Sequence, residues 1–278
     1  MARAHGAVGF LIAGPLAGHV VAGSSGREAG EGIPALGITP ETAARLARTA
    51  TGFPVATMII ETEEGPAETE TLLYDYPGKT DEWVVLSAHV DGHDLAESAM
   101  DNGTGLAAVL AVTRALAPHA ANLRRGLRVM FFSVEEWALT GSAQYVEALS
   151  AQERSKIALN VNLDSVAGSP NLAALSSGYA GVEPFILGVA ETNGLAVRTV
   201  RPLMTNSDHA NFAQGGIPAL RLVAGFDDPA AHLRVVLTPA DTRDKVNQGE
   251  LRTATLFTAA LVAAACNAAP AEAARWRK

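Results

Sequence analysis

The stretch SAHVDGHDLAESAMDNGTG, residues 87–105, decides how the rest of the chain is interpreted. It follows the apolar run WVVL at 83–86, which is typical of a buried strand. It leads into LAAVLAV at 106–112, which predicts the first turns of a buried helix. Because an open α/β sheet binds ligands just beyond the carboxyl ends of its strands, we expect a functional site in this loop.

The loop carries an unusual number of acids and imidazoles: His89, Asp91, His93, Asp94, Glu97 and Asp101. Such groups repel one another or lose hydration when they are buried together, unless a counter-charge is present. A divalent metal ion supplies that charge. Histidine and carboxylate ligands suit zinc, which keeps a coordination position open for water. His93, taken alone, is interpreted as a loop histidine and not as a ligand.

Downstream of residue 70 the pattern alternates between strands and helices, which favours a mostly parallel sheet. The expected fold is an α/β three-layer sandwich, with a mostly parallel mixed central sheet flanked by helices. Strands are predicted at 71–76, 84–88, 126–133, 157–163, 197–203 and 218–223, and helices at 103–116, 140–149, 182–192, 208–214 and 248–265. The tail from residue 270 is predicted to fray.

Two further strands are predicted to deliver acids at their carboxyl ends, namely Glu135 with Glu136, and Asp164. Neighbouring side chains on an extended segment point apart, so one glutamate could bind metal while the other faces water. That division fits hydrolysis by metal-activated water with a carboxylate as the base. Asp91 lies two residues after His89 and is predicted to accept its ring N–H and fix the tautomer.

Composition narrows the classes of partner. The chain has 278 residues, 48% of them hydrophobic, and a formal net charge of −8 without a basic cluster, so we expect no nucleic-acid partner. No run is long and apolar enough to span a bilayer. Cys266 is the sole cysteine, which excludes an intrachain disulfide. Gly14-Pro15 interrupts the early apolar run, so a cytoplasmic location is favoured over a secreted one.

Several motifs, taken in order, resemble the co-catalytic zinc aminopeptidase family, which includes carboxypeptidase Q and glutamate carboxypeptidase relatives. They are HVD (89–91), MDNGTG (100–105), SVEE (133–136), NLDS (162–165), NSDHANFAQGGIPA (206–219) and TPADTRDKV (238–246). The resemblance implies a zinc-dependent peptidase with a peptide substrate and two zinc ions. It implies His89 and Asp164 on one zinc, Asp101 bridging both and followed by a cis peptide, Glu136 on the second zinc, and Glu135 as general base.

One position departs from the family pattern. The family usually has a histidine immediately before the threonine of the last motif, as the remaining ligand of the second zinc, and here that residue is Leu237. Leucine cannot bind zinc, so the second site is in doubt. Either His232 or His209 supplies the missing ligand, or one zinc suffices, or activity is lost.

Residues 1–66 resemble the later part of a protease-associated domain, on the motifs GAVGFLIAG (6–14) and GIPALGIT (32–39). We therefore expect a small partial β-rich domain over 1–66, with strands at 8–13, 33–39 and 54–60, and a zinc exopeptidase domain over 67–278. The acidic segment 61–70 is interpreted as the hinge between them. An incomplete β-rich domain exposes strand edges.

The sequence therefore predicts a zinc exopeptidase, with aminopeptidase as the first hypothesis. A catalytically impaired relative that binds peptides or a partner protein is the second. A carboxypeptidase or dipeptidase on the same scaffold is the third.

Overall fold

The computed structural model describes residues 2–22, 32–49, 55–61, 63 and 65–278. Its main body is a seven-stranded sheet in the order β3-β5-β4-β6-β9-β7-β8. The strands are β3 (Leu72–Tyr76), β4 (Trp83–His89), β5 (Gly126–Phe132), β6 (Ile157–Leu163), β7 (Leu172–Leu175), β8 (Val197–Val200) and β9 (Ala219–Ala224). β3 is antiparallel to β5, and β7 is antiparallel to β9, while the other pairs are parallel. The predicted α/β fold with a mixed sheet is confirmed.

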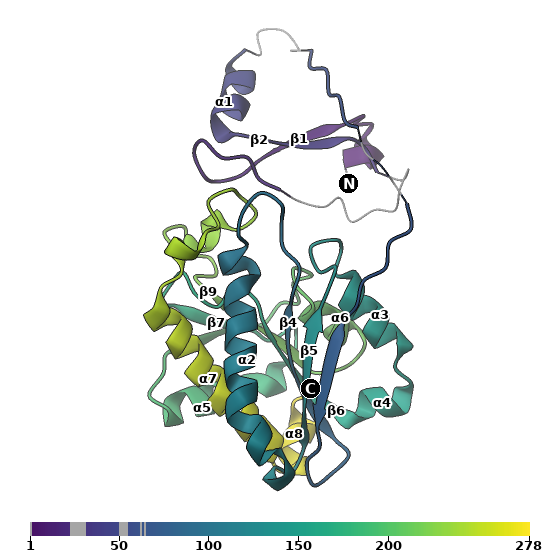
Figure 1. Ribbon diagram of the computed structural model, residues 1–278, viewed down its shortest axis with the longest axis vertical. Helices are drawn as coiled ribbons and strands as arrows, with labels where there is room; N and C mark the ends of the chain where they lie inside the picture. Colours follow the sequence, from purple (N-terminus) through teal and green to yellow (C-terminus); the bar gives the residue numbers. More distant parts are fainter. Residues whose placement is uncertain (1, 23–31, 50–54, 62, 64) are drawn as a thin grey trace.

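Helices cover both faces of the sheet, because alternate strand residues are apolar on both sides. One core contains Val84 and Leu86 of β4 together with residues of α2 (Thr104–Leu116), α5 (Glu183–Thr192) and α7 (Gln248–Asn267). A second core contains Val85 with residues of α3 (Thr140–Ala148) and α6 (His209–Gln214). Figure 1 shows α2 and α7 running side by side over the first of these faces. The result is the predicted three-layer arrangement.

The centre of the sheet places three chain segments at one edge. β4 pairs in parallel with β5 on one side and β6 on the other. The three strands therefore end next to one another, at His89, Phe132 and Leu163. The residues that follow each strand meet at this carboxyl edge, as the sequence predicts.

A small layer formed by the N-terminal residues lies beyond that edge (Figure 1). It contains the parallel strands β1 (Phe10–Ala13) and β2 (Ala35–Ile38) and helix α1 (Pro40–Arg48). Thr39 caps α1, and its side chain accepts a hydrogen bond from the Thr42 amide. The amide of Ala22 donates to the Leu237 carbonyl at 2.7 Å, which joins this layer to the catalytic edge.

The third strand predicted for this layer does not form within the described residues. Residues 55–60 have no regular structure, and Val55 and Ile59 are exposed. Apolar composition alone does not make a strand, because a strand needs a neighbour to satisfy its backbone groups. Pro54, the first residue of that predicted strand, lies outside the described residues. The resemblance to a protease-associated domain stays a prediction.

The C-terminal tail differs from the prediction. Residues predicted to fray form helix α8 (Pro270–Arg275), and the following Trp276 is fully buried against Phe185, with ring centroids 4.7 Å apart. The tail is therefore part of the core. Within the described residues, no helix combines the length and apolar character that spanning a membrane requires.

Candidate metal centre

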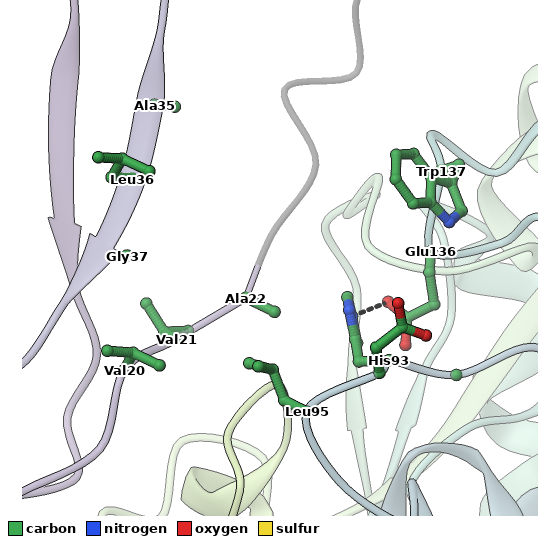
Figure 2. Close-up of a pocket in the computed structure, with 12 residues that line it drawn as sticks. Val20, Val21, Ala22, Ala35, Leu36, Gly37, His93, Leu95, Glu136 and Trp137 are labelled. Atoms are coloured by element: carbon green, nitrogen blue, oxygen red, sulfur yellow. Dashed lines mark ion pairs between the residues drawn. The ribbon is translucent and has the colours of Figure 1, made fainter. Parts of the chain in front are cut away.

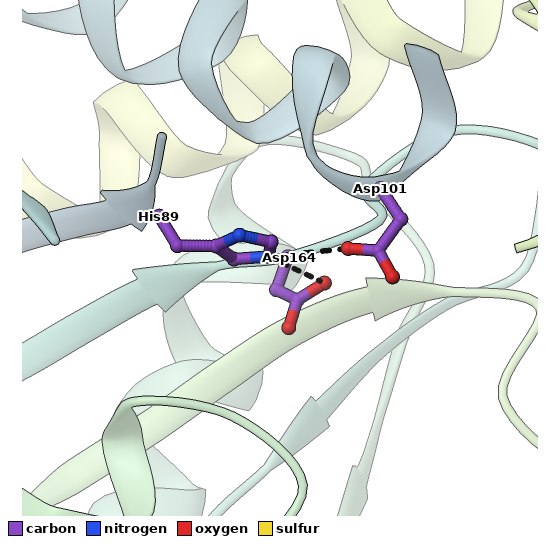
Figure 3. A group of neighbouring side chains, drawn as sticks. All are labelled: His89, Asp101 and Asp164. Atoms are coloured by element: carbon purple, nitrogen blue, oxygen red, sulfur yellow. Dashed lines mark hydrogen bonds and ion pairs between the residues drawn. The ribbon is translucent and has the colours of Figure 1, made fainter. Parts of the chain in front are cut away.

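Three predicted ligands lie together at the carboxyl edge of the sheet. His89 Nε2 is 3.1 Å from Asp101 Oδ1 and 3.9 Å from Asp164 Oδ1. Figure 3 shows both carboxylates pointing to the same nitrogen of the His89 ring. His89 ends β4, Asp164 directly follows β6, and Asp101 lies in the turn before α2. One ligand atom from each residue lies within 4.8 Å of the other two.

The contact that His89 makes through Nδ1 would leave Nε2 available to a metal. Nδ1 is 3.1 Å from the backbone oxygen of Asp91 and 3.6 Å from its carboxylate, so the nearer partner is the carbonyl. A proton held on Nδ1 leaves the Nε2 lone pair directed at the acids. Burial disfavours the charged ring, but Asp101, Asp164 and Asp91 outweigh it and raise the His89 pKa well above its usual value. The three carboxylates therefore stabilise a positive charge at this position.

The two acids of this cluster sit in different electrostatic environments. Burial and the neighbouring Asp164 charge raise the pKa of Asp101 to about 6. Burial would also raise the pKa of Asp164, but the guanidinium of Arg221 and the His89 ring hold it well below its usual range. Arg221 Nη2 lies 3.1 Å from Asp164 Oδ1. The sequence gives no indication of this arginine as a partner, because it sits among apolar residues of β9.

Asp101 is fixed by the turn around it. The Asp101–Asn102 peptide is cis, as the resemblance implies. The side-chain oxygens of Asp241 accept hydrogen bonds from the amides of Met100 and Asp101, at 2.6 and 3.1 Å. Asn102 Nδ2 donates to the Leu163 carbonyl at 2.9 Å, which ties the turn to the end of β6. Sequence reasoning missed Asp241, although it lies inside the quoted TPAD motif.

Glu135 and Glu136 occupy a turn and not an extended segment, so the prediction that they point apart for that reason is wrong. Val134, just before them, has φ of 59°, in the left-handed region. One ligand atom from each glutamate and one from His89 lie within 4.8 Å of one another. Asp91 holds the turn, because its two carboxylate oxygens accept the amides of Glu135 and Glu136, each at 3.1 Å.

The carboxyl group of Glu135 is suited to proton transfer. It is 7% exposed, and burial is the largest cause that raises its pKa well above the usual value. Asp164 and Asp208 raise the pKa further, while the His89 ring lowers it. Asp208 was not predicted as a site residue. It is fully buried, and burial raises its pKa to about 7.

The two histidines that could replace a ligand at position 237 lie apart from both clusters. His232 is exposed, and its Nδ1 is 3.0 Å from the Lys245 carbonyl oxygen. His209 is buried, and burial followed by the charge of Arg221 lowers its pKa to about 3. Among the described residues, neither belongs to a group of three potential metal ligands.

The donor set at His89 fits zinc. Ligand atoms bonded to tetrahedral zinc at about 2.1 Å lie about 3.4 Å apart. The two distances measured from His89 Nε2, 3.1 and 3.9 Å, lie on either side of that value. One neutral imidazole and two carboxylates also give a protein charge that a divalent ion balances. The arrangement can therefore hold a metal ion next to a protonatable glutamate.

Comparison with known proteins places the chain in a family. Residues 71–262 match the family model described as Peptidase family M28, so the chain belongs to that family. A protein named "Probable lipoprotein aminopeptidase LpqL", from Mycobacterium tuberculosis, is 27% identical over 250 residues, covering 81% of this chain and 48% of that protein. Leupeptin-inactivating enzyme 1 of Streptomyces exfoliatus is 33% identical over 172 residues, covering 56% of this chain and 36% of that enzyme.

Solved structures share the fold. A zinc aminopeptidase from Bacillus subtilis superimposes with a TM-score of 0.72 at 23% identity, covering 94% of this chain and 64% of the other. A Peptidase M28 precursor from Shewanella amazonensis gives a TM-score of 0.73 at 23% identity, covering 95% and 61%. The chain spans about half or less of the length of the two curated relatives named above.

Proposed function

We propose that this chain is a zinc-dependent exopeptidase that removes residues from the amino terminus of peptides, with residues 67–278 as the catalytic domain. The observation that carries the proposal is the convergence of His89, Asp101 and Asp164 beside the buried Glu135. In this proposal the first three hold one zinc ion, and Asp101 and Glu136 contribute to a second. Bound zinc supplies a Lewis acid that polarises the scissile carbonyl and lowers the pKa of a coordinated water.

Glu135 acts as the general base in this scheme. Its raised pKa favours taking a proton from the attacking water, which it then returns to the departing amine. Asp91 holds the peptide amides of both glutamates and so fixes where the Glu135 carboxylate points. Burial of Glu135 keeps bulk water from competing for that proton.

The charge around the site favours an amino terminus over a carboxyl terminus. A cavity of ≈ 380 Å³ opens beside Glu136, between the catalytic loops and the N-terminal layer (Figure 2). Among the described residues that line it, the ionisable side chains are His93, Asp94 and Glu136, with no lysine or arginine. A peptide ammonium group would be attracted to these carboxylates, whereas a terminal carboxylate would meet no lysine or arginine among the described residues of the lining.

The test is a Glu135→Gln variant assayed with aminoacyl p-nitroanilides and with matched peptides whose amino terminus is acetylated. We expect zinc content to equal that of the wild type and kcat to fall at least about 100-fold, because general-base catalysis contributes about 10²–10⁴-fold. Glu191→Gln, at an exposed position on α5, is the matched control and should keep full activity. Wild-type turnover by Glu135→Gln would refute the base assignment.

A second candidate is a non-catalytic peptide-binding relative, favoured by Leu237 at the position where the family carries a histidine. The same assay separates the two functions. Binding of unblocked peptides without hydrolysis by the zinc-loaded wild type would support the binder. Faster hydrolysis of acetylated peptides than of unblocked ones would instead indicate a carboxypeptidase, and hydrolysis of free dipeptides but not of longer peptides would indicate a dipeptidase.

A further inference from the structure

The second half of the candidate centre lacks a nitrogen donor. Asp101 and Glu136 offer only carboxylate oxygens, and position 237 is leucine. His232 is exposed and bonded to the Lys245 carbonyl, and among the described ion pairs neither His232 nor His209 contacts Asp101 or Glu136. A donor must therefore come from elsewhere in the fold if a second ion is to be held by more than two protein ligands.

His93 lies in the position where that donor is needed. Its Nε2 is 2.8 Å from Glu136 Oε2, and the two side chains are 18% and 9% exposed. They reach one another from different segments, the loop after β4 and the turn after β5, and Figure 2 shows them facing one another at the edge of the cavity. His89 contacts Asp101, the predicted bridging ligand, at 3.1 Å, and His93 forms the corresponding close contact with Glu136.

At 2.8 Å, His93 Nε2 and Glu136 Oε2 lie at the distance of an ion pair, which leaves Glu136 Oε1 as the oxygen that does not face the ring. Within the described residues, His93 Nε2 and Glu136 Oε1 are both buried polar atoms without a hydrogen-bond partner. An imidazole and a carboxylate paired in this way share a proton, and a metal ion competes with that proton for the same two groups.

The loop is built to hold His93 there. The His93 amide donates to Ser98 Oγ at 3.0 Å, closing the loop across five residues. At Gly92 a Cβ atom would lie 2.4 Å from Ser98 Oγ, so this close approach requires glycine. Gly92 and Ser98 therefore fix the backbone position from which the His93 ring projects.

We propose that His93 Nε2, Glu136 and the bridging carboxylate of Asp101 hold the second zinc ion, with His93 replacing the ligand missing at Leu237. The assignment rests on the proposed function. Glu136 belongs to the cluster with His89 and Glu135, so it links the His93 pair to the first site. Among the described residues, His93 is not in a group of three ligand atoms within 4.8 Å of one another, so a shared zinc ion requires the His93 ring or the Asp101 carboxylate to move inward. Ligand atoms on tetrahedral zinc lie about 3.4 Å apart, so the 2.8 Å contact needs to open by only about 0.6 Å.

The test measures metal directly. The full chain is loaded with zinc, dialysed, analysed by mass spectrometry for zinc per chain, and titrated against a chromophoric chelator. We expect two ions in the wild type and one in His93→Ala, with the affinity of the second site reduced at least about 100-fold, since even outer-shell changes cost 10–100-fold. His232→Ala, the matched control, should keep two ions.

X-ray absorption at the zinc edge on the wild type gives an answer that does not depend on a variant folding. His89 and His93 together supply an average of one imidazole per zinc, whereas His89 alone supplies half. An average of one half, or two ions in His93→Ala at unchanged affinity, overturns the assignment. One ion in the wild type also overturns it but leaves the peptidase proposal standing if that form hydrolyses aminoacyl nitroanilides. Absence of zinc binding and turnover refutes the proposed function itself.

Discussion

Replacing Asp91 by alanine tests how the catalytic turn is held. The Asp91 carboxylate accepts the amides of Glu135 and Glu136, each at 3.1 Å, so the variant loses two hydrogen bonds to a charged group. Such bonds contribute about 1.5–3 kcal/mol each. The side chain is 22% exposed, which places both at the low end, and the expected loss in the free energy of unfolding is about 3 kcal/mol.

The same substitution should reduce catalysis more than substrate binding. Val134, with φ of 59°, precedes the two glutamates, whose own amides both donate to Asp91. Without that acceptor the Glu135 carboxylate can shift, and a misplacement of about 1 Å costs about 100-fold in rate. We expect kcat to fall about 100-fold and KM to change little, because the cavity beside Glu136 does not contain the Asp91 side chain.

The assays are aminoacyl p-nitroanilide kinetics and urea unfolding of the same samples. Asp91→Asn keeps one acceptor oxygen and should lose about half as much stability. Asp81→Ala, before β4 and therefore at the opposite end of the strand, removes an exposed ion pair with Lys156; it should leave kcat unchanged and lower stability far less than Asp91→Ala, because exposed ion pairs contribute little. If Asp91→Ala keeps kcat within threefold of the wild type, the turn is held by something else and the reasoning fails.

The pH dependence of the Asp91 effect follows from its ionisation. Burial raises the pKa of Asp91, but His89 and the amides of Glu135 and Glu136 outweigh it, so the pKa is lowered overall. A lowered folded-state pKa means that the stabilisation is present above the unfolded value of about 3.9 and disappears as pH falls through the folded value. The stability difference between wild type and Asp91→Asn should therefore narrow in strong acid.

Three further outcomes are expected. Trp276→Ala should lower the free energy of unfolding, measured in urea, by about 3–5 kcal/mol, because the fully buried ring packs on Phe185. Trp276→Phe should retain most of the wild-type stability, and wild-type stability of Trp276→Ala would show that the tail does not contribute to the core. Zinc affinity, measured by chelator competition, should fall below about pH 6. The pKa of Asp101 is about 6 and that of His89 is raised, so protons compete with zinc for these two ligands; an affinity that is constant from pH 7 to 5 would contradict this competition. Leu237→His in the His93→Ala background should restore a second bound ion, since histidine tolerates the φ of 60° there; continued binding of one ion would show that position 237 does not face the site.

Much of the fold could be predicted because strand patterns and their ends are local properties of sequence. The runs at β4, β5 and β6 are mostly apolar, and an acid within three residues after each of them marks where it stops. β7 (Leu172–Leu175) was missed because a run of four small or apolar residues is also common in loops. It forms a strand because it pairs with β9 and β8. α8 was missed for a related reason, because the burial of Trp276 depends on distant Phe185.

The contacts that tune the centre could not be predicted, because they join residues far apart in sequence. Arg221 approaches Asp164 only because β9 and β6 are neighbours in the sheet, with Asn162 opposite Arg221. The charge that this arginine contributes lowers the pKa of Asp164, a group that the sequence alone treats as an ordinary acid. The spacing of residues in the sequence predicted which side chains reach the carboxyl edge of the sheet. The order of the strands in the sheet determines which basic side chain lies next to each of these acids.

The His93 pair shows why a motif departure is best judged in three dimensions. A missing ligand at Leu237 suggests a weakened site when the chain is compared position by position with its family. A metal site, however, is defined by where donor atoms converge and not by their order along the chain. Loops vary in backbone path far more than the strands that carry them, so a donor can move from one loop to another while the strand-borne ligands stay in place. His89 and Asp164 come directly from strand ends, whereas His93 and position 237 both belong to loops beside the same edge. An exchange of the donor between two such loops would preserve the charge and coordination that a second ion requires.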